Sequence, residues 1–333
     1  MRAGVIGCGG LGKVHTDCLK QVEGMKMVAF CDVVPERAEA LRGSAGGDYA
    51  TTEPRRLFDD RTLDAVYVCT QHDSHARLCI EALEAGKAVM VEKPLALTVE
   101  DCVRIAQAVE RTGGMLMTAF KMRYFDMILK AKGLIPNPLV VTMQIMDNRW
   151  PDDMWANDPV KGGGNVLSQG CHGCDILRFV AGADPVQVYA AGGNYYQATG
   201  VVDNVCAVFR FDNGAAVSWV NGDPSCASYP SKFYLQMFAE NKSVTLDKRL
   251  THLVYQEAGK EALELQGSET GFVEENRAFV EAIRTGTPAP IDHKDGLMAT
   301  LMPLQAIASL RSGQPEPVLS IFEEAVRRAR AEA

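Results

Sequence analysis

The feature of this sequence that most constrains its fold is a glycine-rich turn near the N-terminus, Gly7-Cys8-Gly9-Gly10-Leu11-Gly12. The turn follows the apolar run RAGVI and precedes an amphipathic stretch, so it predicts a tight connection from a strand into a helix. Asp32 ends a second apolar run 20 residues after Gly12. A strand, turn and helix followed by an acid at this spacing are typical of a dinucleotide-binding parallel sheet.

The spacing of the three glycines explains the chemistry that such a turn supports. Gly7 permits the tight turn, Gly9 permits close approach of a pyrophosphate, and Gly12 permits close packing of helix on strand, while the helix N-terminus offers amide donors. Asp32 would accept hydrogen bonds from both hydroxyls of an adenosine ribose and repel a 2′-phosphate. The sequence therefore predicts NAD(H) in preference to NADP(H).

Two styles of pattern divide the chain. In residues 1–119 short apolar runs alternate with helix-length amphipathic stretches, which predicts βαβ units and a doubly wound parallel sheet. Thr98 to Asp101 resembles a capping box that opens the last of these helices, and Gly113 is placed to close it. We expect an NAD-binding Rossmann domain over residues 1–119.

Longer, alternating strands begin at Pro138. Turn signals at 212–214 and 240–242 join consecutive strands, so a large, mainly antiparallel sheet is expected, with helical segments before and after it. We expect residues 120–333 to form an α+β domain that binds substrate and mediates oligomerisation.

Charge and composition exclude several classes of partner. The net charge of −8 argues against nucleic acid and anionic membranes, because both require a basic surface. No apolar run approaches the roughly 20 residues of a membrane span, and the N-terminus is interpreted as a first strand and not as a signal peptide. The ten cysteines are expected to be reduced and mostly buried, and the protein to be cytoplasmic.

The stretch GGGNVLSQGCHGCD raises a choice between a cysteine site and a histidine site. A zinc ribbon would need a second C-x-x-C, and covalent haem attachment would need a histidine where Asp175 stands. A thioredoxin-like couple would be expected in the N-terminal half. We therefore favour His172 as the working residue, treat Cys171 and Cys174 as small neighbours that let the helix pack closely, and expect no metal site.

Several motifs together resemble one family. They are Gly7 to Gly12 with Lys13-Val14-His15, Thr70 to His75, Glu92-Lys93-Pro94, Trp155 to Pro159, Gly162 to Gly164, and Gly170-x-His172-x-x-Asp175. The combination resembles the glucose-fructose oxidoreductase, inositol dehydrogenase and MocA family of NAD(P)-dependent oxidoreductases, from residue 2 to about residue 312. The resemblance implies a Rossmann domain, a sheet-containing second domain, and a sugar or polyol substrate.

The reaction implied by this resemblance assigns roles to two residues. Oxidation of a secondary alcohol needs a group that takes the proton and a positive group that holds the developing alkoxide. Lys93 follows a parallel strand, at the edge where ligands bind, and can hold the reacting oxygen. His172, with an ordinary pKa near 6.5, can move the proton. Asp175 could bind a substrate hydroxyl, orient the imidazole, or be structural.

The resemblance also implies further site residues. The expected cofactor contacts are Gly7, Gly9, Gly10, Leu11, Gly12, Asp32, Arg37, Thr70, His75, Glu92 and Lys93. The expected substrate contacts are Arg123, Tyr124, Trp155, Asn165, Ser168 and Asp175. Two positions depart from the family pattern. Ser168 stands where an aspartate is common, which predicts a less basic His172, and Ala156 stands where an arginine is common.

The expected function is an NAD(H)-dependent oxidoreductase that acts on a secondary carbinol of a sugar, sugar derivative or polyol. Two alternatives stay open: an NAD-dependent glycosidase that works by transient oxidation and elimination, and a non-catalytic NAD-binding sensor. We expect a homo-oligomer, a dimer or tetramer, formed through the sheet of the second domain.

Overall fold

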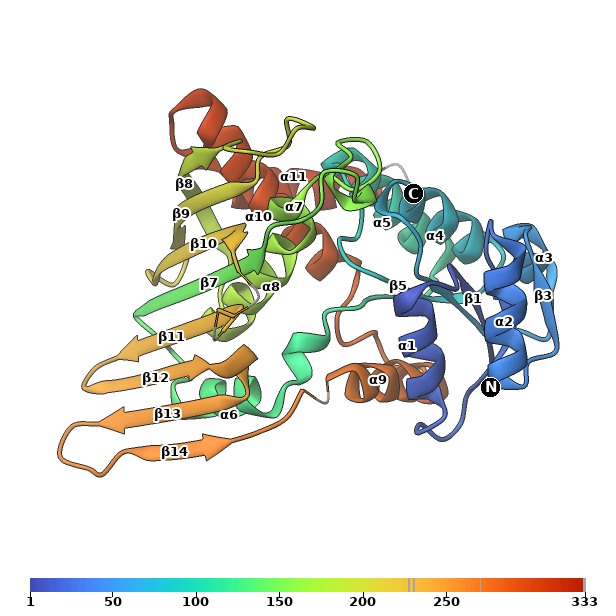
Figure 1. The fold of residues 1–333 in the computed structure, drawn as a ribbon, viewed down its shortest axis with the longest axis horizontal. Coiled ribbons are helices and arrows are strands. Elements are labelled where there is room, and N and C mark those ends of the chain that lie inside the picture. The colour runs from blue at the N-terminus through green and yellow to red at the C-terminus, as the bar shows by residue number, and fades with distance from the viewer. Residues whose placement is uncertain (227, 230, 270, 332–333) are drawn as a thin grey trace. The chain divides into compact units, whose positions relative to one another are not determined.

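The computed structural model describes residues 1–226, 228–229, 231–269 and 271–331, and the chain divides into two compact units (Figure 1). The first unit contains residues 1–121, 272–297 and those from 325 onward. The second unit contains residues 122–271 and 298–324. The predicted division placed everything from residue 120 in one domain. This division differs from the compact units because two C-terminal segments, residues 272–297 and those from 325 onward, belong to the first unit.

The first unit is built on a six-stranded parallel sheet in the order β3-β2-β1-β4-β5-β6. Its strands are β1 (Arg2–Ile6), β2 (Lys26–Cys31), β3 (Tyr49–Thr51), β4 (Ala65–Val68), β5 (Ala88–Val91) and β6 (Leu116–Thr118). This order is that of a dinucleotide-binding sheet, in which the topology reverses between β1 and β4. The predicted doubly wound sheet is confirmed, although the three-residue β3 was not predicted.

Helices α1 (Gly10–Leu19), α2 (Pro35–Ala45), α3 (Pro54–Asp59), α4 (His75–Glu84) and α5 (Val99–Thr112), with a 3₁₀ turn η1 (His72–Ser74), connect these strands. Helix α9 (Gly271–Thr285), which follows β14 in the chain, contributes residues from Phe272 onward to this unit. As predicted, the Thr98 hydroxyl accepts a hydrogen bond from the Asp101 amide at 3.1 Å and caps α5. Gly113, with φ of 63°, ends α5 in a left-handed conformation.

The second unit is built on a nine-stranded sheet in the order β14-β13-β12-β11-β7-β10-β9-β8-β15 (Figure 1). Its strands are β7 (Val140–Asn148), β8 (Pro185–Gly193), β9 (Asn204–Phe211), β10 (Ala216–Ser225), β11 (Phe233–Ala239), β12 (Lys242–Asp247), β13 (His252–Glu257), β14 (Leu263–Gln266) and β15 (Glu316–Pro317). Neighbouring strands pair antiparallel except for the parallel pair β7 and β10. The predicted α+β fold with a mainly antiparallel sheet is confirmed.

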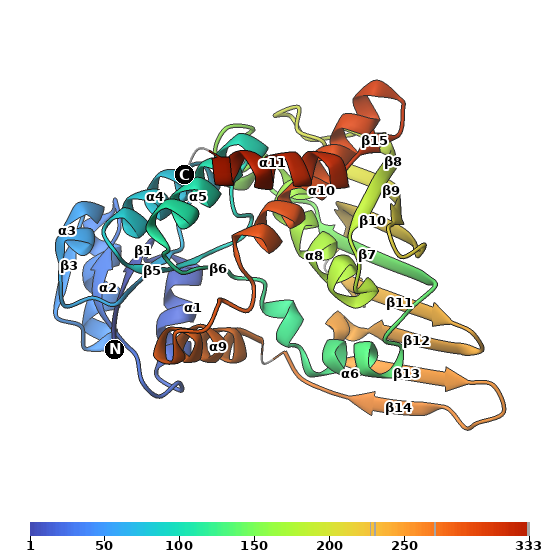
Figure 2. The ribbon, with the colours of Figure 1, turned by 180° about the vertical axis from the view of Figure 1, so that it is seen from behind.

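The helical elements of the second unit are α6 (Asp126–Leu134), α7 (Asn165–Ser168) and α8 (Gly170–Ala181), with the 3₁₀ turns η2 (Lys121–Tyr124), η3 (Trp155–Asn157) and η4 (Lys248–Leu250). Figure 2 labels two helices of the second unit, α6 and α8, and His172 belongs to α8. Two helices, α10 (His293–Ser312) and α11 (Leu319–Ala331), contribute residues to both units. The single helical segment expected around His172 is therefore two helices that meet at Gln169.

Helix α8 packs closely on the sheet because glycines face it. A Cβ on Gly170 would lie 2.5 Å from the Trp219 ring, and a Cβ on Gly173 would lie 2.9 Å from Ile145. Gly170 and Gly173 thus let α8 approach the sheet, and Cys171 and Cys174, the small residues named from the sequence, are fully buried in the same helix.

Most of the ten cysteines are buried, as expected, but Cys206 and Cys226 are exposed. Cys206 lies in the apolar segment CAVF, yet it faces outward in the alternation of β9. Across the described residues, none of the helices combines the length and apolar character needed to cross a bilayer.

Candidate functional site

The glycine turn after β1 contains two kinds of glycine. Gly7 has φ of 93°, and a Cβ there would lie 2.4 Å from the carbonyl oxygen of Cys69. A Cβ on Gly12 would lie 2.0 Å from the carbonyl oxygen of Gly7. At Gly9 and Gly10, by contrast, a Cβ would meet no described atom within 4 Å. Packing therefore requires the outer two glycines, whereas the inner two leave open space that a ligand can approach.

The first backbone amides of α1 lie at this open space, and the helix itself offers them no acceptor. Its N-cap is Gly9, so no side chain caps the helix, and its first turn as described contains no acidic residue. Amide groups at such a helix end favour an anion through their hydrogen bonds and the helix dipole. Leu11 lies beside them and is partly exposed. The turn thus fits the phosphates of a dinucleotide.

Asp32 follows β2 and lies against the same turn. Its Oδ2 accepts from the Cys8 amide at 2.8 Å, and its Oδ1 accepts from the Val34 amide at 2.9 Å. Each carboxylate oxygen retains a lone pair for a further hydroxyl donor. Arg37 is exposed in the first turn of α2. This arrangement fits the ribose end of the same dinucleotide.

His75 connects the loops that follow β4 and β5. It is fully buried, with Nδ1 2.9 Å from the Pro94 carbonyl oxygen and Nε2 3.3 Å from the Thr70 carbonyl oxygen. Burial lowers the pKa of His75, so the neutral ring donates to one of these carbonyls. The structure therefore gives His75 a role in holding Thr70 and the Lys93-Pro94 turn. Direct contact of His75 with a cofactor stays a prediction.

Lys93 lies just beyond β5 beside a buried carboxylate. The Lys93–Pro94 peptide bond is cis, and the Lys93 side chain is half-buried. Glu92 accepts from His15 Nε2 at 3.1 Å and from the Lys93 amide at 3.2 Å. Burial acts to raise the pKa of Glu92, but the hydrogen bond from His15 and the charge of Lys93 outweigh it and leave the pKa below its ordinary value. The negatively charged Glu92 carboxylate therefore lies next to Lys93.

In the second unit, the triple glycine brings several predicted residues together. A Cβ on Gly162 would lie 2.3 Å from the Cα of Ala156, and Gly164 has φ of 87°. The glycine turn therefore presses against η3, whose first residue, Trp155, is 37% exposed. Ala156, which stands where an arginine is common in the family, is buried at this contact.

Helices α7 and α8 begin directly after this turn. Asn165 is buried, and its Oδ1 accepts from Asn221 Nδ2 at 2.8 Å. Ser168 ends α7 and is buried, and His172 lies in the first turn of α8 with 7% of its surface exposed. The turn and the two helices thus place Trp155, Asn165, Ser168 and His172 within one segment of the second unit.

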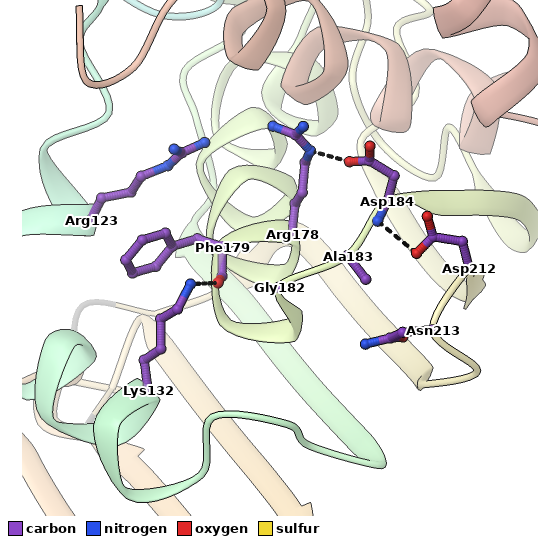
Figure 3. A pocket seen from close by; sticks show the side chains of 9 residues that line it. All are labelled: Arg123, Lys132, Arg178, Phe179, Gly182, Ala183, Asp184, Asp212 and Asn213. Carbon is purple, nitrogen blue, oxygen red and sulfur yellow. Dashed lines mark hydrogen bonds and ion pairs between the residues drawn. The ribbon is translucent and has the colours of Figure 1, made fainter.

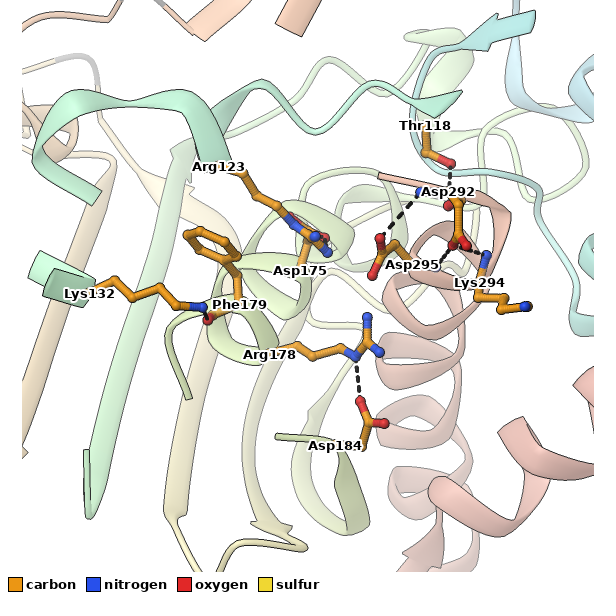
Figure 4. A network of polar contacts seen from close by, with 10 residues as sticks. All are labelled: Thr118, Arg123, Lys132, Asp175, Arg178, Phe179, Asp184, Asp292, Lys294 and Asp295. Atoms are coloured by element: carbon orange, nitrogen blue, oxygen red, sulfur yellow. Dashed lines mark hydrogen bonds and ion pairs between the residues drawn. The ribbon is translucent and has the colours of Figure 1, made fainter. Parts of the chain in front are cut away.

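Arg123 and Asp175, predicted separately as substrate contacts, form one ion pair (Figure 4). The Arg123 Nε lies 3.0 Å from Oδ1 and 2.9 Å from Oδ2, and Nη2 lies 2.5 Å from Oδ1. Asp175 is 1% exposed. The two residues are 52 positions apart, so no local sequence signal could reveal the pair. Tyr124 follows Arg123 in η2 and is half-buried.

A hollow of about 500 Å³ lies at the carboxyl end of α8, the opposite end from His172 (Figure 3). Three cations line it, and each is engaged. Arg123 holds Asp175, Arg178 Nε lies 2.5 Å from Asp184 Oδ1, and Lys132 Nζ lies 2.5 Å from the Phe179 carbonyl oxygen. These contacts hold the carboxyl end of α8 in place. Because each cation already has an oxygen partner, the hollow is not proposed as an anion site.

The two cysteines of the C-x-x-C spacing are buried in α8. The Cys171 thiol donates to the Ser168 carbonyl at 3.3 Å, and burial raises the pKa of Cys174 well above its ordinary value. Cys174 is therefore held as a thiol, and none of the ten cysteines forms a disulfide. In the part of the chain that the structure describes, no three His, Cys, Asp or Glu side chains are grouped to hold a metal ion.

Sequence reasoning missed two buried carboxylates that hold loops in the second unit. Asp223 accepts from the Trp150 amide at 2.7 Å and from the Tyr196 hydroxyl, and burial raises its pKa. Asp203 accepts from the Tyr195 amide at 3.0 Å. The available signal was an acid just before β9 and another near the end of β10, each beside an otherwise apolar run. These carboxylates fix the segments around Trp150 and Tyr196.

Comparison with known proteins agrees with this architecture. A sequence profile described as an oxidoreductase family with an NAD-binding Rossmann fold matches residues 1–120, and one described as the GFO/IDH/MocA C-terminal domain matches residues 129–239. The chain is 28% identical over 327 residues to myo-inositol 2-dehydrogenase of Thermotoga maritima, covering 93% of this chain and 96% of that protein.

Two further relatives differ in the ligands that their names give. D-xylose 1-dehydrogenase (NADP(+)) 2 of Haloferax volcanii is 25% identical, covering 89% of this chain and 93% of that protein. The solved structure of levoglucosan dehydrogenase with NADH and levoglucosan has a TM-score of 0.85, covers 96% of this chain and 99% of that chain, and is 22% identical, a likeness of fold. With both of its units matched, this chain belongs to the GFO/IDH/MocA family of oxidoreductases, with an NAD-binding Rossmann fold in its N-terminal part.

Proposed function

We propose that this protein is an NAD(H)-dependent oxidoreductase that transfers hydride between nicotinamide and a secondary carbinol of a sugar, sugar derivative or polyol. The observation that carries the proposal is Lys93, which stands beside the Glu92 carboxylate at the carboxyl end of β5. Ligands of doubly wound sheets bind at this edge. The names of the relatives, which include an inositol, a xylose and a levoglucosan dehydrogenase, support a sugar or polyol substrate.

The residues of the glycine turn would hold the dinucleotide. The α1 amides bind the pyrophosphate over Gly9 and Gly10, and Thr70 lies after β4 near the same turn. Asp32 accepts the ribose hydroxyls and disfavours a 2′-phosphate, which supports NAD(H) over NADP(H). Exposed Arg37 acts in the opposite sense, so the ratio of the two cofactors is the quantity to measure.

The chemistry then assigns one role to each polar group. Bound nicotinamide supplies the hydride acceptor or donor. Lys93 donates a hydrogen bond to the reacting oxygen and stabilises its negative charge, and the Glu92 carboxylate, which accepts from the Lys93 amide, lies next to it. His172 accepts the proton of the carbinol and returns it in the reverse direction. Ser168 supplies a hydroxyl and no charge, so His172 is less basic than it would be beside an aspartate.

The remaining substrate contacts come from the second unit. The partly exposed Trp155 offers a ring face that can stack on a sugar, and Tyr124, Asn165 and Ser168 offer hydrogen-bonding groups. The Asp175 carboxylate forms an ion pair with Arg123. We therefore propose that the pair stabilises α8, in addition to any contact that it makes with the substrate.

The proposal is tested with purified protein, NAD+ and a panel of inositols, aldoses, sugar acids and glycosides, with the absorbance of NADH as the readout. A dehydrogenase forms one NADH for each substrate oxidised. Release of free sugar from a glycoside without net NADH would contradict the proposal in favour of a glycosidase. Tight binding of NAD+ with no turnover across the panel would contradict it in favour of a sensor.

We further propose a homo-oligomer in a reducing compartment such as the cytoplasm. Alternate residues on the strands of the second unit expose apolar side chains, among them Val140, Tyr189 and Val208. A sheet face of this kind is typically covered by a partner. The ten free cysteines support a reducing compartment. Light scattering after size-exclusion chromatography checks the assembly, and a monomer at micromolar concentration would contradict it.

A further inference from the structure

A second buried carboxyl lies in the first unit near Glu92. Glu275 of α9 is fully buried, and among the described residues neither of its carboxyl oxygens has a hydrogen-bond partner. Its neighbour Asn276 donates to the Phe272 carbonyl at 2.7 Å and lies 2.9 Å from His15 Nδ1. Because His15 also contacts Glu92, the chain from Asn276 through His15 links α9 to the strand end that carries Lys93.

The groups that act on Glu275 come from several elements packed around it. Burial and then the negative charge of Glu92 raise the pKa of Glu275 well above its ordinary value, while Lys121 acts in the opposite sense. The Lys121 ammonium lies 3.8 Å from the centre of the Phe272 ring. The other titratable groups that interact with Glu275 are Cys18 of α1, Tyr67 of β4 and Cys69, which follows β4.

Only one of the two carboxyls is built to carry a charge. Glu92 accepts hydrogen bonds from His15 and from the Lys93 amide, whereas the structure gives Glu275 no such donors. A buried carboxylate without donors is strongly destabilised, and two nearby carboxyls resist being ionised together. We propose that Glu275 keeps its proton in the folded protein and forms with Glu92 a buried carboxyl pair that carries a single negative charge behind Lys93.

This pair makes Glu275 a positioning residue for Lys93, an assignment that rests on the proposed function. Glu275 touches neither substrate nor cofactor and acts through Glu92. While Glu275 is neutral, Lys93 experiences one negative charge. When Glu92 is replaced by glutamine, burial without hydrogen-bond donors still keeps the proton on Glu275, so the pair loses its charge. Glu275 thus keeps the single charge of the pair on Glu92, next to Lys93.

The proton on Glu275 is tested without any substrate. For an acid whose pKa is raised by folding, stability is fully present below the unfolded pKa of about 4.3 and is lost as pH rises toward the folded value. We expect the free energy of unfolding of Glu275→Gln to exceed that of the wild type by a margin that grows with pH, with a slope of about one proton. The exposed Glu323→Gln is the matched control and should show no such slope. A pH-independent difference between wild type and Glu275→Gln would overturn the proposal.

If Glu275→Gln fails to fold, the wild type itself provides the measurement. In protein labelled with carbon-13 at the glutamate carboxyl carbons, one carboxyl should remain protonated at neutral pH. A spectrum in which every glutamate is ionised at neutral pH would overturn the proposal.

The effect on Lys93 is tested by a double-mutant cycle with the alkaline limb of the kcat profile as the readout. Glu275→Gln alone should change kcat less than twofold at neutral pH, because glutamine preserves neutrality. Glu92→Gln, with or without Glu275→Gln, should lower kcat to the same level and shift the alkaline limb to lower pH, because only Glu92 carries the charge of the pair. An alkaline limb that shifts in Glu275→Gln alone would contradict the pair, because Glu275 would then be the charged member. If the wild type turns over no substrate, the proposed function fails, while the unfolding experiment still decides whether Glu275 holds its proton.

Discussion

The two units of this protein build their candidate sites in different ways. In the first unit, the predicted residues follow strand ends and act largely through main-chain groups, as at the turn from Gly7 to Gly12. In the second unit, His172 is a buried side chain, and Asp175 and Asn165 near it in the sequence pair with Arg123 and Asn221, far along the chain. The first kind of site is determined by local sequence, and the second by packing across the fold.

The largest expected effect tests the strand-end chemistry of the first unit. Lys93→Met should lower kcat by roughly 10²–10⁴-fold, because the reacting oxygen loses its positive partner. Binding of NAD+, measured by calorimetry, should change little, since the glycine turn and Asp32 are untouched. Lys20→Met, on the exposed end of α1, is the control and should behave as wild type. A Lys93→Met enzyme that keeps most of its turnover would remove Lys93 from the mechanism.

The next effect tests the long-range packing of the second unit. Asp175→Asn should lower the free energy of unfolding by about 3–5 kcal/mol, because Arg123 loses the buried carboxylate that it holds. The double variant Arg123→Met/Asp175→Leu should recover part of this loss, since it removes both charges together. Chemical denaturation measures both. Equal stability of Asp175→Asn and the wild type would show that the ion pair does not support α8.

A third effect compares two glycines in the same turn. Gly12→Ala should destabilise the protein by about 1–3 kcal/mol, because its Cβ would overlap the Gly7 carbonyl. Gly10→Ala should leave stability unchanged or slightly raised, because that position is open and alanine favours a helix. Thermal unfolding distinguishes them. If both variants were equally destabilised, the distinction between packing glycines and ligand-facing glycines would be wrong.

This contrast also explains how much the sequence could predict. The parallel sheet, the glycine turn and the antiparallel sheet followed from periodicity and turn residues, which act over a few positions. The short β3 and the break at Gln169 did not, because neither has a strong local pattern. Asp203 and Asp223 left only a weak signal, as acids in otherwise apolar runs. The pairing of Arg123 with Asp175 and the burial of Glu275 depend on contacts between distant residues, which no single-sequence signal reports.

A smaller effect concerns the choice of cofactor. Asp32→Ala should shift the ratio of kcat/KM for NAD+ over NADP+ toward NADP+ by about tenfold or more, because the carboxylate that repels a 2′-phosphate is removed. Steady-state kinetics with both cofactors measures the ratio. The exposed Glu36→Ala, in the first turn of α2, serves as the control. An unchanged ratio would mean that Asp32 does not set the preference.

The smallest expected effect lies in the C-x-x-C stretch. Cys171→Ala/Cys174→Ala should keep kcat within about twofold of the wild type, because both side chains are buried, and should lower stability by no more than about 1–2 kcal/mol per site. Activity with and without a chelator or a reductant provides the check. A variant that loses turnover while remaining folded would restore a chemical role for the cysteines.

The central claim is hydride transfer between a carbinol carbon and nicotinamide, and isotope transfer tests it most directly. The wild-type enzyme is given NAD+ and an active sugar or polyol that carries deuterium on the reacting carbon, and the products are analysed by mass spectrometry. Direct hydride transfer predicts one deuterium in each NADH formed, and Lys93→Met should no longer transfer the deuterium to NAD+. Product formation with the deuterium found in solvent, or returned to the sugar without NADH, would contradict it.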